Sequence, residues 1–251
     1  MPPIIKKVAI AGVIDYSFVP ELTEAIRGQD ALINATDITI IITPQINLVD
    51  TATAAGVYYY LPSEYGLNTH KPENGEVPIF KATSTGLKHM RRKCATSGGA
   101  TTYTDVHNGG LLDWDFETDF MGILPRERVL TLYDEGSNEI AYTMREWLGM
   151  AIVSVLTHPE RTVNRSIFIA NTYVSQNKLL ALAQEVVGNK EWTVTHKSTD
   201  ECLQIQWQSF IHVADSNPKY ETRWEKNDNE LLGIPKFSDE DIMAVIKSVV
   251  T

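Results

Sequence analysis

The chain has 251 residues, enough to bury a sizeable core in one large domain or in two closely associated ones. Its formal net charge of −10 argues against nucleic acid or an anionic membrane surface as a partner. No apolar run approaches the length of a membrane span, and no signal peptide is apparent, so we expect a cytoplasmic protein. Cys94 and Cys202 lie far apart without metal-ligand spacing, which favours reduced thiols and no metal site.

Strand and helix patterns alternate along the first two-thirds of the chain, which predicts a parallel α/β sheet. Strands are predicted at 6–15, 31–34, 57–61 and 101–106, with helices at 18–28, 44–55 and 79–95. A long loop is expected from 107 to 125. Further strands are predicted at 129–133, 167–170 and 192–196, and helices at 144–156, 177–187 and 239–249. Ser175 and Ser238 are expected to cap the last two helices.

The first strand pattern, from Lys6 to Gly12, is typical of the opening of a dinucleotide-binding domain. Such a strand should continue into a glycine-rich turn and a helix whose N-terminus holds a diphosphate. Gly12 is instead followed by Val13-Ile14-Asp15, which extends the strand. The pattern therefore indicates a nucleotide site that lacks the loop to hold the nucleotide.

Five groups of short strings occur in a defined order along the chain: GQDALI at 28–33; AAGV at 54–57 with LPSEYG at 61–66; LLDW at 111–114; VLTHPE at 155–160 with NR at 164–165; and NELLGIP at 229–235. Together the strings cover nearly the whole chain. They resemble the NmrA-like and isoflavone-reductase-like group of atypical short-chain reductases, especially its fungal members. The resemblance implies a Rossmann fold that binds NADP(H), and enzymes that reduce phenolic or other small secondary metabolites. NmrA itself is a regulator that binds dinucleotides without known redox turnover.

The chain departs from this family at its first strand, where at least one βα unit of roughly 30 residues, with its Gly-x-x-Gly-x-x-Gly loop, is missing. We expect a shortened Rossmann-like parallel sheet with helices on both faces and a smaller C-terminal substrate region. Residues 1–172 are predicted to form the core, with 111–140 contributing to the substrate region, and 173–251 to form the rest of that region.

The fused first strand should lie at the edge of the sheet, beside the strand at 31–34. Val8, Ile10 and Val13 would then be poorly covered. An exposed edge with an apolar patch predicts a homodimer through that edge, or an unstable protein.

The missing segment would also remove the main-chain amides that hold a diphosphate and the arginine that meets the 2′-phosphate of NADPH. We therefore expect binding of NADP(H) to be impaired. The remaining candidates for cofactor binding lie near the ends of predicted strands, where ordinary polar residues also occur: Gly12, Asn34, Thr36, Pro62 and Ser63.

The resemblance also implies a catalytic lysine early in the helix at 79–95. Aligning residues 77–80 with the usual entry to that helix places Thr83 at the lysine position. Lys81 lies two residues earlier, a rotation of about 200° on a helix and therefore nearly the opposite face. In an active reductase, Lys81 or a side chain of the loop at 62–66 would have to assist proton transfer.

Two further side chains suit acid–base chemistry at the ends of predicted strands. Glu64 is a candidate proton acceptor, and His107 a candidate general acid or base. Candidates for substrate binding are Tyr65, Asn108, Gly109, Asp113 and Trp114. Each of these residues also has a structural interpretation, as a turn, a satisfied buried group or core packing.

The sequence favours a protein of NAD(P)H-dependent reductase lineage that acts on or binds a small phenolic or secondary-metabolite ligand, with impaired redox activity. A second interpretation is a non-redox ligand-binding regulator, or an isomerase or cyclase in which His107 or Glu64 moves a proton. A third is an internally shortened form with little function.

Overall fold

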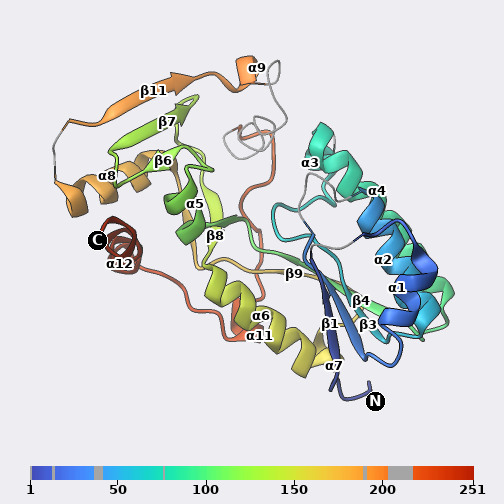
Figure 1. Ribbon diagram of the computed structural model, residues 1–251. Coiled ribbons are helices and arrows are strands. Elements are labelled where there is room, and N and C mark those ends of the chain that lie inside the picture. Colours follow the sequence, from blue (N-terminus) through green and yellow to red (C-terminus); the bar gives the residue numbers. More distant parts are fainter. Residues whose placement is uncertain (1, 13–14, 37–41, 76, 189–190, 203–216) are drawn as a thin grey trace. The chain divides into compact units, whose positions relative to one another are not determined.

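The computed structural model describes residues 2–12, 15–36, 42–75, 77–188, 191–202 and 217–251 (Figure 1). The chain divides into two compact units. Unit 1 comprises 1–65, 78–107 and 152–167, and unit 2 comprises 66–77, 108–151 and 168–251. The segment 111–140, expected to contribute to a substrate region, belongs to unit 2.

A five-stranded sheet, with strand order β1-β2-β3-β4-β9, forms the centre of unit 1. β1 to β4 pair in parallel, as the alternation of strands and helices predicts. β1 lies at the edge of this sheet beside β2, which confirms its expected position. The strands are β1 (Val8–Ala11), β2 (Ala31–Asn34), β3 (Tyr59–Leu61), β4 (Thr102–His107) and β9 (Arg165–Phe168).

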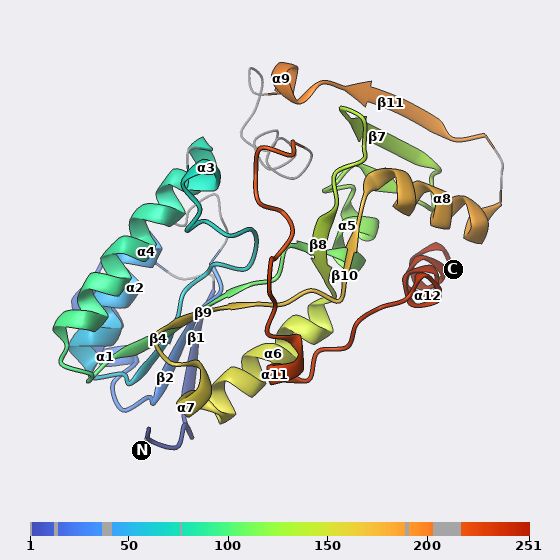
Figure 2. The ribbon, with the colours of Figure 1, turned by 180° about the vertical axis from the view of Figure 1, so that it is seen from behind.

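Helices cover both faces of this sheet (Figures 1 and 2). On one face lie α1 (Val19–Ala25), α2 (Ile42–Ala55) and α4 (Pro78–Thr96), and on the other α7 (Pro159–Thr162) and the end of α6 (Arg145–Thr157). A buried cluster joins the sheet to α2 and α4 through Leu32, Leu48, Tyr60 and Met90. This arrangement confirms the predicted Rossmann-like α/β class. Within the described part of the chain, no helix has both the length and the apolar character needed to cross a bilayer.

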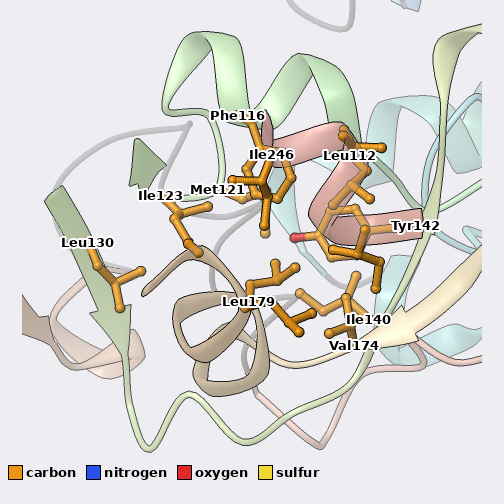
Figure 3. Close-up of a cluster of buried hydrophobic side chains, with 14 of the residues drawn as sticks. Leu112, Phe116, Met121, Ile123, Leu130, Ile140, Tyr142, Val174, Leu179 and Ile246 are labelled. Atoms are coloured by element: carbon orange, nitrogen blue, oxygen red, sulfur yellow. The ribbon is translucent and has the colours of Figure 1, made fainter. Parts of the chain in front are cut away.

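Unit 2 contains two three-stranded sheets, with orders β10-β8-β5 and β11-β7-β6. Figure 3 shows its core, where Phe116, Tyr142, Leu179 and Ile246 come together from four different elements. The strands are β5 (Gly110–Leu111), β6 (Ile123–Leu124), β7 (Val129–Tyr133), β8 (Ile140–Thr143), β10 (Thr172–Val174) and β11 (Thr193–Lys197). The helices are α3 (Pro72–Gly75), α5 (Leu112–Thr118), α8 (Gln176–Val187), α9 (Thr199–Cys202), α11 (Asn229–Leu232) and α12 (Asp239–Val250).

Both predicted serine caps are confirmed. The Ser175 hydroxyl accepts a hydrogen bond from the Lys178 N–H at 3.3 Å at the start of α8. Ser238 and Asp241 form a reciprocal capping box at the start of α12. These caps satisfy N–H groups that have no partner within the helix, which explains why the two helices begin where the sequence predicts.

The prediction of a long loop at 107–125 is wrong, because this segment contains β5, α5 and β6. Leu112 and Phe116 are four residues apart on α5 and enter the core together, a helical spacing within a short segment. The strand expected at 167–170 lies at 165–168, and the strands β8 and β10 were not predicted. The strand expected at 6–15 spans Val8–Ala11, while Val13 lies outside the described residues.

Candidate functional site

The polar candidates of unit 1 lie at the carboxyl ends of parallel strands. Asn34 is the last residue of β2, Ser63 and Glu64 follow β3, and His107 is the last residue of β4. Because β2, β3 and β4 are parallel, these ends share one edge of the sheet. In open α/β sheets, ligands bind at this edge.

Gln45, in the first turn of α2, is the centre of a buried hydrogen-bond network at this edge. Its amide nitrogen donates to Glu64 Oε1 at 2.7 Å. Its amide oxygen accepts from Asn34 Nδ2 at 3.1 Å and from the Ser63 N–H at 3.2 Å. Gly86 on α4 leaves the necessary space, because a Cβ there would lie 2.7 Å from Gln45 Cγ. Gln45 therefore fixes the ends of β2 and β3 relative to each other.

Asn34 and Thr36, predicted to contact a cofactor, are directed toward neighbouring protein groups. The Asn34 amide oxygen accepts from the Thr36 N–H at 3.0 Å and from the Thr36 hydroxyl at 2.8 Å. The Ser63 hydroxyl in turn donates to the Thr36 carbonyl at 2.8 Å. These bonds hold the backbone where β2 and β3 end, so the three side chains shape this edge of the sheet.

The Pro62–Glu64 segment is a tight turn that buries a carboxylate. Pro62 is buried, and its carbonyl accepts from the Glu64 N–H at 3.0 Å. The Glu64 side chain is only 3% exposed and receives the Gln45 amide. Burial, and then the Glu64 charge, raise the pKa of the neighbouring Tyr65 hydroxyl. Tyr65 therefore stays protonated at physiological pH and keeps its O–H as a hydrogen-bond donor.

The Tyr65 hydroxyl has no hydrogen-bond partner among the described residues. Thr83 lies on the buried side of α4 and is 4% exposed, and its hydroxyl also has no hydrogen-bond partner among the described residues. Lys81, two residues earlier on the same helix, is exposed, as the rotation predicts. Buried hydroxyls normally have a partner, so Tyr65 and Thr83, together with Thr51 on α2, offer unused hydrogen-bonding capacity in the described part of unit 1.

Asp105 and His107 form a buried pair on one face of β4. They are two residues apart on a strand, so their side chains point to the same side of the sheet. His107 Nε2 lies 2.9 Å from Asp105 Oδ2, and both side chains are fully buried. A carboxylate in this position holds the imidazole in one orientation and one tautomer. Asp105 was not among the residues predicted from the sequence, although the D-x-H spacing on a strand is the signal that identifies it.

Close packing within unit 2 explains Gly109 and Gly110. Gly109 has φ +66°, and a Cβ there would lie 1.9 Å from the Ala141 carbonyl oxygen on β8. A Cβ at Gly110 would lie 2.6 Å from the Tyr142 ring. The adjacent Asn108 is buried; its carbonyl accepts from the Thr143 hydroxyl at 2.9 Å, while its amide oxygen has no partner among the described residues. Both glycines therefore permit β5 to pair with β8.

Asp113 and Trp114 lie on α5, and each has a partner in unit 2. Asp113 Oδ2 accepts from Arg145 Nε at 2.9 Å, and the same guanidinium reaches Glu117 Oε1 at 2.7 Å. The Trp114 ring packs against Phe120 with centroids 4.7 Å apart. These contacts connect α5 to the start of α6 and to the segment that follows α5.

Two fungal oxidoreductases are similar to this chain over most of its length. Oxidoreductase poxI from Penicillium oxalicum is 26% identical over 250 residues, covering 90% of this chain and 76% of the relative. Oxidoreductase aprR from Aspergillus flavus is 30% identical over 261 residues, covering 95% of this chain and 84% of the relative. The chain belongs to the NmrA-like, isoflavone-reductase-like family of oxidoreductases. No protein-family profile matches it.

Solved structures show that this NmrA-like protein has the reductase fold. AtPrR2 with NADP+ and (+)-pinoresinol has a TM-score of 0.71 at 19% identity, covering 94% of this chain and 80% of AtPrR2. An isoflavone reductase has a TM-score of 0.70 at 16% identity, covering 97% of this chain and 90% of that protein. Reductases of this fold thus share the arrangement of strands and helices described above.

The passage from β1 to α1 is where a Rossmann domain would hold a dinucleotide diphosphate. No glycine occurs from residue 13 to residue 27. α1 has seven residues, its N-cap Phe18 makes no side-chain cap, and Pro20 in its first turn has no N–H to donate. A Cβ at Gly12 would meet nothing within 4 Å, so close packing in the described structure does not require this glycine. The residues that the structure describes between β1 and α1 in this NmrA-like protein therefore do not fit a dinucleotide diphosphate, the group that the fold implies.

Proposed function

We propose that this NmrA-like protein binds a small phenolic or related secondary metabolite and that it transfers hydride from NADP(H) poorly. The oxidoreductase relatives support a small-molecule ligand. The AtPrR2 structure with NADP+ and (+)-pinoresinol supports an aromatic ligand, and NADP(H) as the dinucleotide to test. Two cysteines far apart in the sequence, Cys94 and Cys202, support a reducing cytoplasm as its location.

The observation that carries this proposal is the passage from β1 to α1. A diphosphate needs several backbone N–H groups at a helix N-terminus, and glycine where the chain approaches it closely. The short α1, its proline and the glycine-free segment offer little of either. The alignment with poxI runs over 250 positions but covers only 90% of this 251-residue chain. At the remaining aligned positions poxI has residues where this chain has none.

Isothermal titration calorimetry with NADPH and NADP+ tests the proposal, with AtPrR2 as the positive control. We expect no saturable binding below about 1 mM, which corresponds to a binding free energy weaker than about −4 kcal/mol. A dissociation constant in the low micromolar range would contradict it. Because weak binding need not abolish turnover, NADPH oxidation should be followed with a panel of phenolic ketones and activated alkenes. Rapid oxidation with any of these compounds would also contradict the proposal.

The hydroxyls of Tyr65 and Thr83 are the ligand contacts that we propose in unit 1. Each is buried and lacks a hydrogen-bond partner among the described residues, so a phenolic hydroxyl or carbonyl could satisfy it. Tyr65→Phe should weaken binding of a phenolic ligand by about tenfold, because one hydrogen bond is lost. Tyr60→Phe is the matched control, since the Tyr60 hydroxyl already lies 3.4 Å from Asn34 Nδ2. Equal affinities of the two variants would contradict this contact.

The buried Asp105–His107 pair favours a second candidate function, proton transfer without hydride transfer, as in an isomerase or cyclase. Asp105 would hold the imidazole, and His107 would accept a proton from one position of the ligand and return it to another. Glu64 is less suited, because its carboxylate is bound to Gln45. This chemistry needs no dinucleotide.

His107→Gln tests this second function in a search for isomerised products without added NADPH. His89→Gln is the matched control, because His89 Nε2 lies 2.9 Å from Asp50 Oδ1 in a similar pair between α2 and α4. If the wild type converts a compound, His107→Gln should abolish the conversion and His89→Gln should preserve it. Conversion that survives His107→Gln would dismiss the role.

A further inference from the structure

β1 leaves one of its two sides open. It pairs with β2 on one side, and in the part of the chain that the structure describes no strand pairs with the other. The open side of an edge strand carries backbone N–H and C=O groups that can pair with another strand. The sequence predicts that this exposed edge gives a homodimer or an unstable protein, and the geometry of β1 specifies how a dimer would form.

The hydrogen bonds to β2 identify which residues face outward. The Ala31 N–H donates to the Lys7 carbonyl at 3.1 Å, and the Ala35 N–H donates to the Ala11 carbonyl at 2.8 Å. Backbone groups alternate in direction along a strand, so Lys7, Ala9 and Ala11 face β2. The N–H and C=O groups of Val8 and Ile10 therefore point to the open side.

The same two residues carry an uncovered apolar face. Val8 is 39% exposed and Ile10 is 70% exposed, whereas their neighbours in β2, Ala31 and Ile33, are 0% and 6% exposed. On this face of the sheet, the side chains of β2 are thus covered by other parts of the protein, whereas those of β1 are not. Phe18, in the segment that follows β1, is also exposed. Large exposed aliphatic side chains on an open strand edge are typical of an interaction surface.

We propose that β1 pairs with β1 of a second copy of this chain, in antiparallel orientation about a two-fold axis at Ala9. In this register Val8 lies opposite the partner's Ile10, and Ile10 lies opposite the partner's Val8. Both pairs are hydrogen-bonded pairs, so all four outward groups of each copy are satisfied. The four aliphatic side chains meet on the uncovered face, and the small Ala9 side chains allow the closer approach that a non-hydrogen-bonded pair needs.

Charge favours this orientation and a second copy as the occupant. Lys6 and Lys7 are exposed at the start of β1, and the exposed Asp15 follows its end. Hydrogen bonds from Ser17 lower the pKa of Asp15, so its carboxylate is ionised at neutral pH. Antiparallel pairing places the lysines of each copy beside the end of the partner's strand and keeps the two lysine pairs apart. Parallel pairing would align lysine with lysine, which is unfavourable.

Sedimentation equilibrium on the full chain tests the dimer. The interface formed by one pair of strands is small, so we expect a weak dimer. As the concentration is raised to about 100 μM, the average mass should increase from the 28.1 kDa of one chain toward twice that value. Ile10→Lys should hold the mass at that of one chain, because it places a charge on the apolar face. Val153→Lys is the matched control: Val153 is also exposed in unit 1, on α6, and the variant should dimerise as the wild type does. A monomeric wild type, or a dimer unaffected by Ile10→Lys, would overturn the proposal.

Disulfide cross-linking tests the register. The two Ala9 residues face each other in a non-hydrogen-bonded pair, with Cα atoms about 4.5 Å apart, within the range of a disulfide. Ala9→Cys should therefore form a cross-linked dimer under mild oxidation. Lys7→Cys, on the same face of the strand, should not form a cross-link, because Lys7 lies opposite the partner's Ala11 in this register. Cross-linking through Lys7→Cys in place of Ala9→Cys would overturn this register.

Discussion

Gly109→Ala is the substitution that best separates packing from ligand binding at a predicted site residue. The new Cβ would lie 1.9 Å from the Ala141 carbonyl oxygen, far inside van der Waals contact, and φ of +66° disfavours any L-residue. The left-handed conformation costs about 1–2 kcal/mol. Overpacking against β8 adds about 1–3 kcal/mol. We therefore expect the free energy of unfolding of unit 2 to fall by about 3 kcal/mol or more.

Tryptophan fluorescence during urea unfolding measures this change. All five tryptophans lie at positions within unit 2, so the signal reports on the unit that contains Gly109. Gly233→Ala is the matched control: Gly233 has φ +72° with nothing within 4 Å of a Cβ, so it should lose only the conformational part, about 1–2 kcal/mol.

Equal losses in the two variants would refute the packing explanation. If Gly109→Ala were as stable as the control but failed to bind a ligand that the wild type binds, the glycine would serve the ligand. Such a result would support the sequence prediction that Gly109 contacts substrate.

Three further predictions concern buried and capping groups. Gln45→Leu should lower the free energy of unfolding by about 2–4 kcal/mol, because the buried Glu64 carboxylate loses its 2.7 Å donor; an unchanged urea midpoint would contradict this role. Burial tends to raise the pKa of Asp50, but hydrogen bonds from His89 and a lysine outweigh it and leave the pKa below 3.8. The stability advantage of wild type over Asp50→Asn should thus be complete above pH 3.8 and shrink as the pH falls below it; an advantage that grows on acidification would refute this sign. Ser238→Ala should cost about 1 kcal/mol through loss of the α12 cap, measured by thermal unfolding, and no loss would contradict the capping box.

The parallel core was predictable because its information is local. The strand at 31–34 follows from an apolar run and the turn residues beside it, and in unit 2 the starts of α8 and α12 follow equally locally from the capping residues Ser175 and Ser238. β5 was not predictable in this way. It has two residues, and it exists because Gly110 and Leu111 pair with Tyr142 and Thr143 far along the chain.

The candidate site shows the same division. Glu64 and His107 could be selected from the sequence as polar residues at the ends of strands. The contact between Gln45 and Glu64 could not be predicted, because Gln45 reaches Glu64 from another element, whereas Asp105 lies two residues from His107 on the same strand. Gln45 occupies the buried side of α2 with Leu48, Val49 and Ala52, and a glutamine at such a position is the signal to follow. The exposure of Val8 and Ile10, in contrast, follows from the predicted edge position of β1.

A structure determined from crystals grown with excess NADPH tests most directly whether this chain can bind a dinucleotide. The short, proline-containing α1 and the absence of glycine after Gly12 predict no ordered diphosphate at the end of β1. Clear density for the NADPH diphosphate, held by backbone N–H groups of residues 12–19, would contradict the proposed function.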